Sequence, residues 1–133
     1  MMWSERMISR EFVLAGRAIF TVSNGKGKHY TYRVTMGKLH AFVSILNGSD
    51  NTWNYVNIAM ISPVTGRLIG QYGDDIRIKV LRWALRQIWR QSSLPQGYAI
   101  QHAGKCGRCG RLLTTPQSLE SGLGPECKEK ANG

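Results

Sequence analysis

Short, largely apolar stretches recur along the chain between residues 12 and 72, and such stretches bounded by turn-forming residues are typical of strands. The stretches with this pattern are rich in β-branched and aromatic residues, which favour extended backbone. They are residues 12–14, 18–22, 30–34, 41–46, 53–60 and 67–72. Turn-forming sequences separate them, at residues 24–27, 47–51 and 63–66. Because every connection is short, we predict an antiparallel meander of about five strands.

At residues 76–91 the apolar residues recur at the period of a helix. Its apolar residues fall on one side, which we expect to pack on the sheet. They are Val80, Leu81, Ala84, Leu85 and Ile88. Asp74 or Asp75 is placed to cap the first turn, where a negative charge suits the helix dipole. Pro95 and Gly97 then end the helical pattern.

The opposite side of this predicted helix carries only positive charge. This basic stripe consists of Lys79, Arg82, Arg86 and Arg90. The four side chains fall within an arc of about 80°, at about 100° per residue. Trp83 and Trp89 flank the stripe, and we expect both rings to pack at the rim of the core, with a role as base-stacking platforms as the alternative. Because four like charges repel one another, we predict that the stripe meets a polyanion; an ordinary solvated face is the alternative.

The whole chain is also strongly basic. Its 133 residues include 18 Lys and Arg against 8 Asp and Glu, a net charge of +10, and 42% are hydrophobic, enough for a core. Such a charge points to a polyanionic partner, most commonly nucleic acid, although it could also serve solubility alone. No apolar stretch is long enough to span a bilayer, and the charged start MMWSERMISREF does not resemble an export signal. We expect a cytoplasmic protein.

All three cysteines lie in the last quarter of the chain, and an odd number argues against a closed disulfide framework. Cys106 and Cys109 form a Cys-x2-Cys pair, and Cys127 follows after seventeen residues. Three thiolates that turn toward one ion favour zinc in a cytosol. His102 is the nearest histidine, so we predict one structural Zn²⁺ bound by His-x3-Cys-x2-Cys-x17-Cys. Glu126 or a water molecule is the alternative fourth ligand.

A redox-active Cys-x2-Cys pair is the alternative to a metal site, but the βαβ pattern that usually surrounds such a pair is missing. Between the cysteines, Thr115 and Pro116 begin a predicted short helix that Gly122 ends. The expected apolar core of this small module consists of Leu112, Leu113, Leu119 and Leu123. About thirty residues bury too little apolar surface to fold alone, so we expect the metal to contribute to folding.

Residues 106–127 follow the pattern Cys-Gly-Arg-Cys-Gly-Arg-x-Leu-Thr-x-Pro-x-Ser-Leu-x-x-Gly-x-Gly-Pro-x-Cys. This run closely resembles a zinc-binding C-terminal module of small uncharacterised phage and prophage proteins. The resemblance extends over residues 11–129 and departs from the family's pattern around residues 57–64. It implies His102, Cys106, Cys109 and Cys127 as zinc ligands, and it implies no particular reaction.

An enzyme is the class that the sequence favours least. Four protein ligands close a zinc site, whereas a catalytic zinc needs an open position. The sequence contains no glycine-rich phosphate loop, no Ser-His-Asp candidate set and too few carboxylates for two-metal hydrolysis. We also expect no small-molecule substrate and no membrane partner.

We therefore predict an α+β protein in which residues 11–97 form an antiparallel β-meander packed by one amphipathic helix, and residues 98–130 form a zinc-finger module. Its predicted function is binding of DNA or RNA through the phosphate backbone, without strong sequence preference. The binding residues are the basic stripe and, within the zinc module, Lys105, Arg108 and Arg111. The alternative is a phage-encoded inhibitor of a host nucleoprotein complex, in defence (as an anti-CRISPR protein acts) or in transcription.

Overall fold

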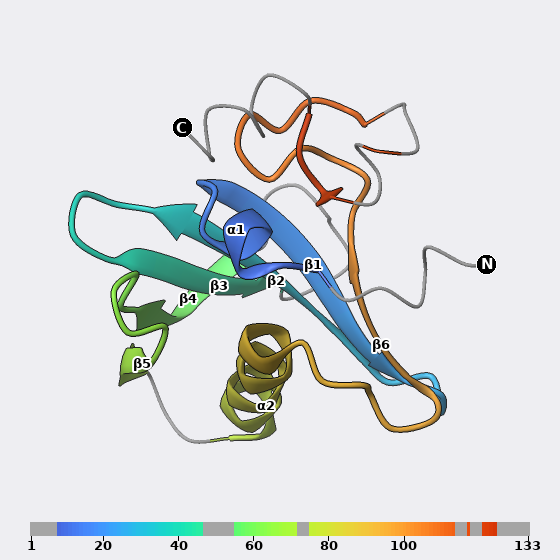
Figure 1. Cartoon of the computed structure of the whole chain (residues 1–133). Helices are drawn as coiled ribbons and strands as arrows, with labels where there is room; N and C mark the ends of the chain where they lie inside the picture. Colours follow the sequence, from blue (N-terminus) through green and yellow to red (C-terminus); the bar gives the residue numbers. More distant parts are fainter. Residues whose placement is uncertain (1–7, 47–54, 72–74, 114–116, 118–120, 125–133) are drawn as a thin grey trace.

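The computed structural model describes residues 8–46, 55–71, 75–113, 117 and 121–124. In this part of the chain, one antiparallel sheet is combined with one long and one short helix (Figure 1). The strands are β1 (Arg17–Asn24), β2 (His29–Met36), β3 (Ala41–Leu46), β4 (Tyr55–Ile61), β5 (Leu68–Gln71) and β6 (Tyr98–His102), and the helices are α1 (Arg10–Val13) and α2 (Ile76–Arg90). The strand order is β5-β4-β3-β2-β1-β6. The predicted α+β class is confirmed.

The predicted meander is present as β1 to β5. Asn24 holds the first hairpin, because its Oδ1 accepts main-chain hydrogen bonds from Lys26 at 2.9 Å and Lys28 at 3.2 Å. At the predicted turn between β4 and β5, the Gly66 N–H donates to the Ser62 carbonyl at 2.7 Å. The strand observed as β4 was predicted to start at residue 53, and that residue lies outside the described residues, as does the turn predicted at 47–51.

Two elements differ from the sequence prediction. Residues 12–14 were expected to be extended, but this prediction is wrong, because Phe12 and Val13 belong to the single turn of α1. Ser9 caps this turn, and its Oγ accepts a hydrogen bond from the Phe12 N–H at 3.1 Å. The second difference is β6, which no pattern predicted and which pairs antiparallel with β1. The sheet thus continues past residue 97, the predicted end of the first part of the chain, as far as His102. The division into two parts, residues 11–97 and 98–130, stays a prediction.

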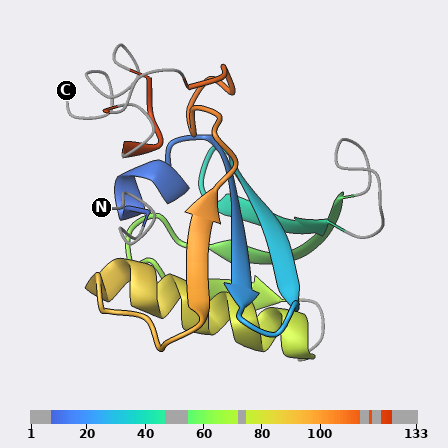
Figure 2. The same ribbon diagram turned by 90° about the vertical axis from the view of Figure 1, so that its right-hand side faces the viewer.

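Both helices cover one face of the sheet, and residues 103–113 lie at the opposite end of the molecule from α2. Figures 1 and 2 show α1 between these two parts. Helix α2 begins after Asp75, whose side chain caps it by accepting from the Arg77 N–H at 3.0 Å. A hydrogen bond from the Arg77 side chain lowers the pKa of Asp75. Within the described residues, neither helix has the length and apolar character that a membrane span needs.

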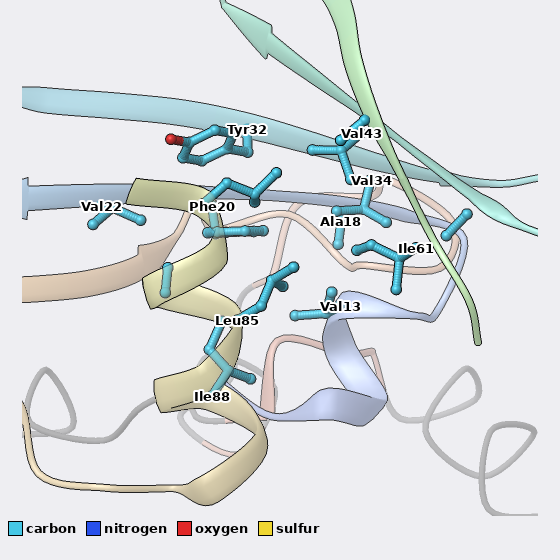
Figure 3. Close-up of a cluster of buried hydrophobic side chains, with 14 of the residues drawn as sticks. Val13, Ala18, Phe20, Val22, Tyr32, Val34, Val43, Ile61, Leu85 and Ile88 are labelled. Atoms are coloured by element: carbon cyan, nitrogen blue, oxygen red, sulfur yellow. The ribbon is translucent and has the colours of Figure 1, made fainter. Parts of the chain in front are cut away.

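One continuous core lies between the sheet and the helices. Figure 3 shows Val13 of α1 and Leu85 and Ile88 of α2 directed toward residues of the strands. The strand residues of this cluster that Figure 3 labels are Ala18, Phe20, Val22, Tyr32, Val34, Val43 and Ile61. The buried face of α2 differs from the prediction at one position, because Ile78 is buried whereas Val80 is only partly buried.

The two tryptophans of α2 are partly buried and pack against this core, as predicted. The Trp89 Nε1–H donates to the Gly66 carbonyl at 2.6 Å, so this ring ties the helix to the turn before β5. The ring of Trp83 lies 5.4 Å from that of Tyr98, the first residue of β6. Each indole therefore fixes α2 to a different edge of the sheet.

Candidate metal centre and nucleic-acid interface

Cys106 and Cys109 lie in one tight turn shortly after β6, at residues 105–111, which we call the cysteine turn. The Cys106 N–H donates to the Arg111 carbonyl at 2.8 Å, and the Gly110 N–H donates to the Cys106 carbonyl at 2.9 Å. Gly110 has a φ of 81°, a left-handed conformation that glycine adopts without steric cost. The backbone conformation of this turn therefore explains the glycine that follows Cys109.

The sulfur of Cys106 lies in surroundings that favour the thiolate. The residue is buried, with 1% of its surface exposed, and its Sγ accepts main-chain hydrogen bonds from Arg108 at 3.4 Å and Gly124 at 3.3 Å. Burial raises the pKa of this thiol, but hydrogen bonds from Gly124, Cys109 and Arg108 outweigh that effect and lower the pKa to about 7. Cys109 is exposed. A thiolate is the form in which cysteine binds metals.

The chain returns to this turn at residues 122–124. The Gly107 N–H donates to the Gly122 carbonyl at 2.8 Å, and Gly124, three residues before Cys127 in the sequence, contacts the Cys106 sulfur. Cys127 itself lies outside the described residues, as do Glu126 and most of the short helix predicted at 115–122.

A second, smaller apolar cluster supports the turn. It consists of Cys106, Leu113 and Leu123, with Ala15 packed against it. The prediction that Leu112 belongs to this core is wrong, because 73% of its surface is exposed. Leu112 pairs with Lys105 in an isolated antiparallel bridge, and adjacent residues on a strand point in opposite directions, so burial of Leu113 turns Leu112 outward.

His102 is the last residue of β6. Its Nδ1 accepts a hydrogen bond from the Gly104 N–H at 2.9 Å, so binding of a metal would fall to Nε2, the other ring nitrogen. Among the described residues, no three His, Cys, Asp or Glu side chains are grouped as metal ligands. Cys106 and Cys109 are brought together, and the roles of His102 and Cys127 stay predictions.

Phe12 of α1 joins the cysteine turn to the rest of the protein. Its side chain is completely buried, and the ring centroid lies 5.6 Å from that of His102. A Cβ atom at Gly107 would lie 2.6 Å from Cδ1 of this ring, and one at Gly122 would lie 2.5 Å from it. In addition, the Arg17 N–H of β1 donates to the Gly107 carbonyl at 2.6 Å. Only glycine at both positions leaves room for the ring.

The second candidate site is a hollow of about 520 Å³ between α2 and the turn that precedes β5. Its lining includes Arg82, Arg86 and Arg90 of the basic stripe and a fourth arginine, Arg67, from that turn, and none of the described residues that line it is acidic. Arg82 donates to the Gln71 Oε1 at 2.6 Å. Three of the four stripe residues thus converge on one concave surface, which we call the arginine hollow.

Lys79 lies apart from the arginine hollow and lines a separate groove. The remaining predicted binding residues, Lys105, Arg108 and Arg111, are all exposed on the cysteine turn. This turn lies at the opposite end of the molecule from α2 (Figure 2). The stripe and the cysteine turn therefore do not form one compact patch.

Arg10 of α1 lies between these two basic regions. Its guanidinium carbon is 5.1 Å from the centroid of the Trp89 ring, and its Nη2 donates to the carbonyl of Pro63 at 3.1 Å. Arg10 also lines a hollow of about 480 Å³ together with Arg108 and one acidic residue, Glu11. The sequence did not predict a role for Arg10 or Arg67, because both lie outside the periodic pattern of α2 and reach its side chains only through the fold.

Part of the chain matches a known protein family. Residues 99–132 match DUF6011, a family of unknown function. The match covers β6 except its first residue, together with the cysteine-rich segment, and leaves the meander and α2 outside it. No curated protein and no solved structure is significantly similar to this chain.

Proposed function

We propose that the cysteine-rich segment binds one structural zinc ion through Cys106, Cys109, Cys127 and His102. The buried Cys106 sulfur, which accepts two main-chain hydrogen bonds, supports this proposal, because such bonds stabilise a thiolate ligand. The return of the chain at Gly124 supports it further, since Cys127 follows shortly after. When bound, zinc supplies a cross-link between these segments. The sequence resemblance to phage and prophage proteins suggests the same role.

We further propose that the protein binds nucleic acid, largely through the phosphate backbone. The observation that carries this proposal is the arginine hollow, where Arg67 from the turn before β5 meets Arg82, Arg86 and Arg90 of α2, and where no described lining residue is acidic. Within the described residues, neither Arg86 nor Arg90 has an ion-pair partner. Guanidinium groups recognise phosphate through paired N–H donors, so a phosphate in the hollow would relieve their mutual repulsion.

The path of the nucleic acid would lead from the arginine hollow along α1 to the cysteine turn. Arg10 supports this path, because it contacts Trp89 of α2 and lines a common hollow with Arg108. Glu11 lies in the same hollow and weakens the attraction there. We therefore expect the arginine hollow to contribute more to the affinity for nucleic acid than the hollow lined by Arg10 and Arg108.

This proposal predicts that nucleic-acid binding depends less steeply on salt when the charges of two stripe residues are removed. The double variant Arg86→Gln, Arg90→Gln should bind a 20-base-pair duplex more weakly, and the slope of log K against log salt should fall by about 1.8, roughly 0.9 per lost phosphate contact. Both side chains are exposed, so the free energy of unfolding should change by less than about 0.5 kcal/mol each. Fluorescence anisotropy between about 50 and 200 mM salt measures the slope.

A matched control separates a local site from the effect of net charge. Lys26→Gln, Lys38→Gln removes the same charge from two exposed residues outside the arginine hollow, and should leave the slope nearly unchanged. Equal slopes for the two double variants would remove the arginine hollow from the binding site. Salt-independent recovery of one defined protein partner after nuclease treatment would instead support the alternative function, inhibition of a host complex.

A further inference from the structure

A groove of about 730 Å³ lies on the other side of α2 from the arginine hollow. The first half of α2, the β1–β2 hairpin and the loop before β6 form its walls. Figures 1 and 2 show this hairpin and this loop side by side next to α2. The volume lies within the range of about 300–1,000 Å³ that is usual for small-ligand sites, so the groove is large enough for a nucleobase.

Three aromatic side chains line this groove, namely Tyr30, Trp83 and Tyr98. Trp83 packs against the core and is held in place, and its ring lies 5.4 Å from that of Tyr98 at an interplanar angle of 54°. Tyr98 is 45% exposed. A fixed indole thus supports a tyrosine ring that still presents surface to the solvent, which is the arrangement of a stacking platform.

Main-chain contact keeps the groove in this shape. A Cβ atom at Gly25, in the hairpin, would lie 3.3 Å from both Cα and the carbonyl oxygen of Gly97, in the loop before Tyr98. The Tyr98 N–H donates to the Pro95 carbonyl at 3.1 Å, which closes the turn in that loop. The tyrosine is therefore positioned before any ligand arrives, and binding costs little ordering.

The charges around the groove match an anionic ligand. Lys28 of the hairpin and Lys79 of α2 line different walls, both are exposed, and none of the described residues that line the groove is acidic. Aromatic rings next to cations are the usual means of binding single-stranded nucleic acid, because bases stack on the rings and the cations meet the phosphates. In a duplex, neighbouring base pairs already cover the base faces, so only an unpaired base can use such a ring.

We propose that this groove binds unpaired bases of a single-stranded nucleic acid, with Tyr98 and Trp83 as the stacking surface and Lys28 and Lys79 on the adjacent phosphates. This inference rests on the proposed function and specifies its partner: a strand with an unpaired segment next to the contacts at the arginine hollow. It also assigns Lys79 a role different from that of the other three stripe residues.

The test compares two substitutions of Tyr98 on two probes of equal length, a fluorescein-labelled oligo(dT) and a duplex. Tyr98→Leu keeps an apolar side chain next to Trp83 but removes the aromatic face, and should weaken oligo(dT) binding by about 5- to 150-fold, the range for one stacked base. Duplex binding should not change. Tyr98→Phe, the matched control, keeps the ring and should retain affinity for both probes.

Lys79→Gln gives a second readout that does not depend on the packing of β6. It should lower the salt slope for oligo(dT) by about 0.7 and leave the slope for the duplex unchanged. Equal loss on both probes with Tyr98→Leu, or no loss on oligo(dT) with either variant, would overturn the groove proposal alone. No binding of either probe by the unaltered protein would overturn the proposed function itself, and the groove proposal with it.

Discussion

Purified protein is expected to contain about one zinc ion per chain, and Cys106→Ser is expected to lose it. Cys106 is buried and its sulfur accepts hydrogen bonds from two segments, so a hydroxyl in its place leaves an incomplete ligand set. Structural zinc contributes about 10–16 kcal/mol to the folding of small modules near neutral pH. Residues 102–130 should therefore become sensitive to protease, while the sheet and α2 stay folded. Elemental analysis and limited proteolysis measure the two effects.

The fourth ligand can be tested separately. His102→Gln should lower the zinc content, whereas His40→Gln, which lies in the meander, should not. Retention of zinc by His102→Gln would transfer the fourth position to Glu126 or water and leave the three cysteines as ligands. Retention of a full equivalent by Cys106→Ser would refute the metal site.

The second large effect is expected from Phe12→Ala, which should reduce the free energy of unfolding by about 3–5 kcal/mol, the usual cost of truncating a buried phenylalanine. The ring is completely buried and fills the space beside Gly107 and Gly122. Its loss should leave a cavity between α1 and the cysteine turn, and the turn should separate from the sheet more easily. Urea denaturation followed by circular dichroism measures the change.

Phe42→Ala provides a control with the same chemical change. Phe42 lies on the outer face of β3 and is 41% exposed, so its truncation removes less buried surface and should cost clearly less. A cost for Phe12→Ala no larger than that for Phe42→Ala would contradict the role of Phe12 as the contact that holds the two parts together. Gly122→Ala should act in the same direction as Phe12→Ala, because its φ of 77° and the nearby ring both oppose a side chain.

The sequence predicted the elements whose signal is local and repeated. The helix α2 spans four turns of consistent period and begins at a capping aspartate, and the meander strands are separated by turns of known chemistry. The one wrong prediction for the buried face of α2 has a geometric reason. Ile78 precedes Leu85 by two helical turns and therefore lies on the same face, whereas Val80 lies at the edge of that face.

Elements that depend on distant partners were not predictable. α1 is a single turn, too short to show a period, and its apolar pair Phe12 and Val13 is compatible with a strand. β6 is a short edge strand whose partner in the sheet, β1, lies near the start of the chain. Its hydrogen bonds are formed with residues that no local pattern connects to it.

The same distinction applies to the candidate sites. The spacing of Cys106 and Cys109 is local, so the sequence alone placed them in one turn. The arginine hollow combines α2 with Arg67 of the turn before β5, and the groove lined by Trp83 and Tyr98 combines three separate segments. Such surfaces form only when the chain folds, because tertiary packing decides which exposed side chains become neighbours.

The place of β6 in the sheet has a consequence for synthesis of the protein. β1 can pair with β2 as soon as the short hairpin between them has been synthesised. The other edge of β1 stays unpaired until the ribosome has released the whole of α2 and β6. An unpaired strand edge is a template for pairing with another chain. Nascent chains that stall before residue 98 should therefore associate through β1, and chains that are completed should not.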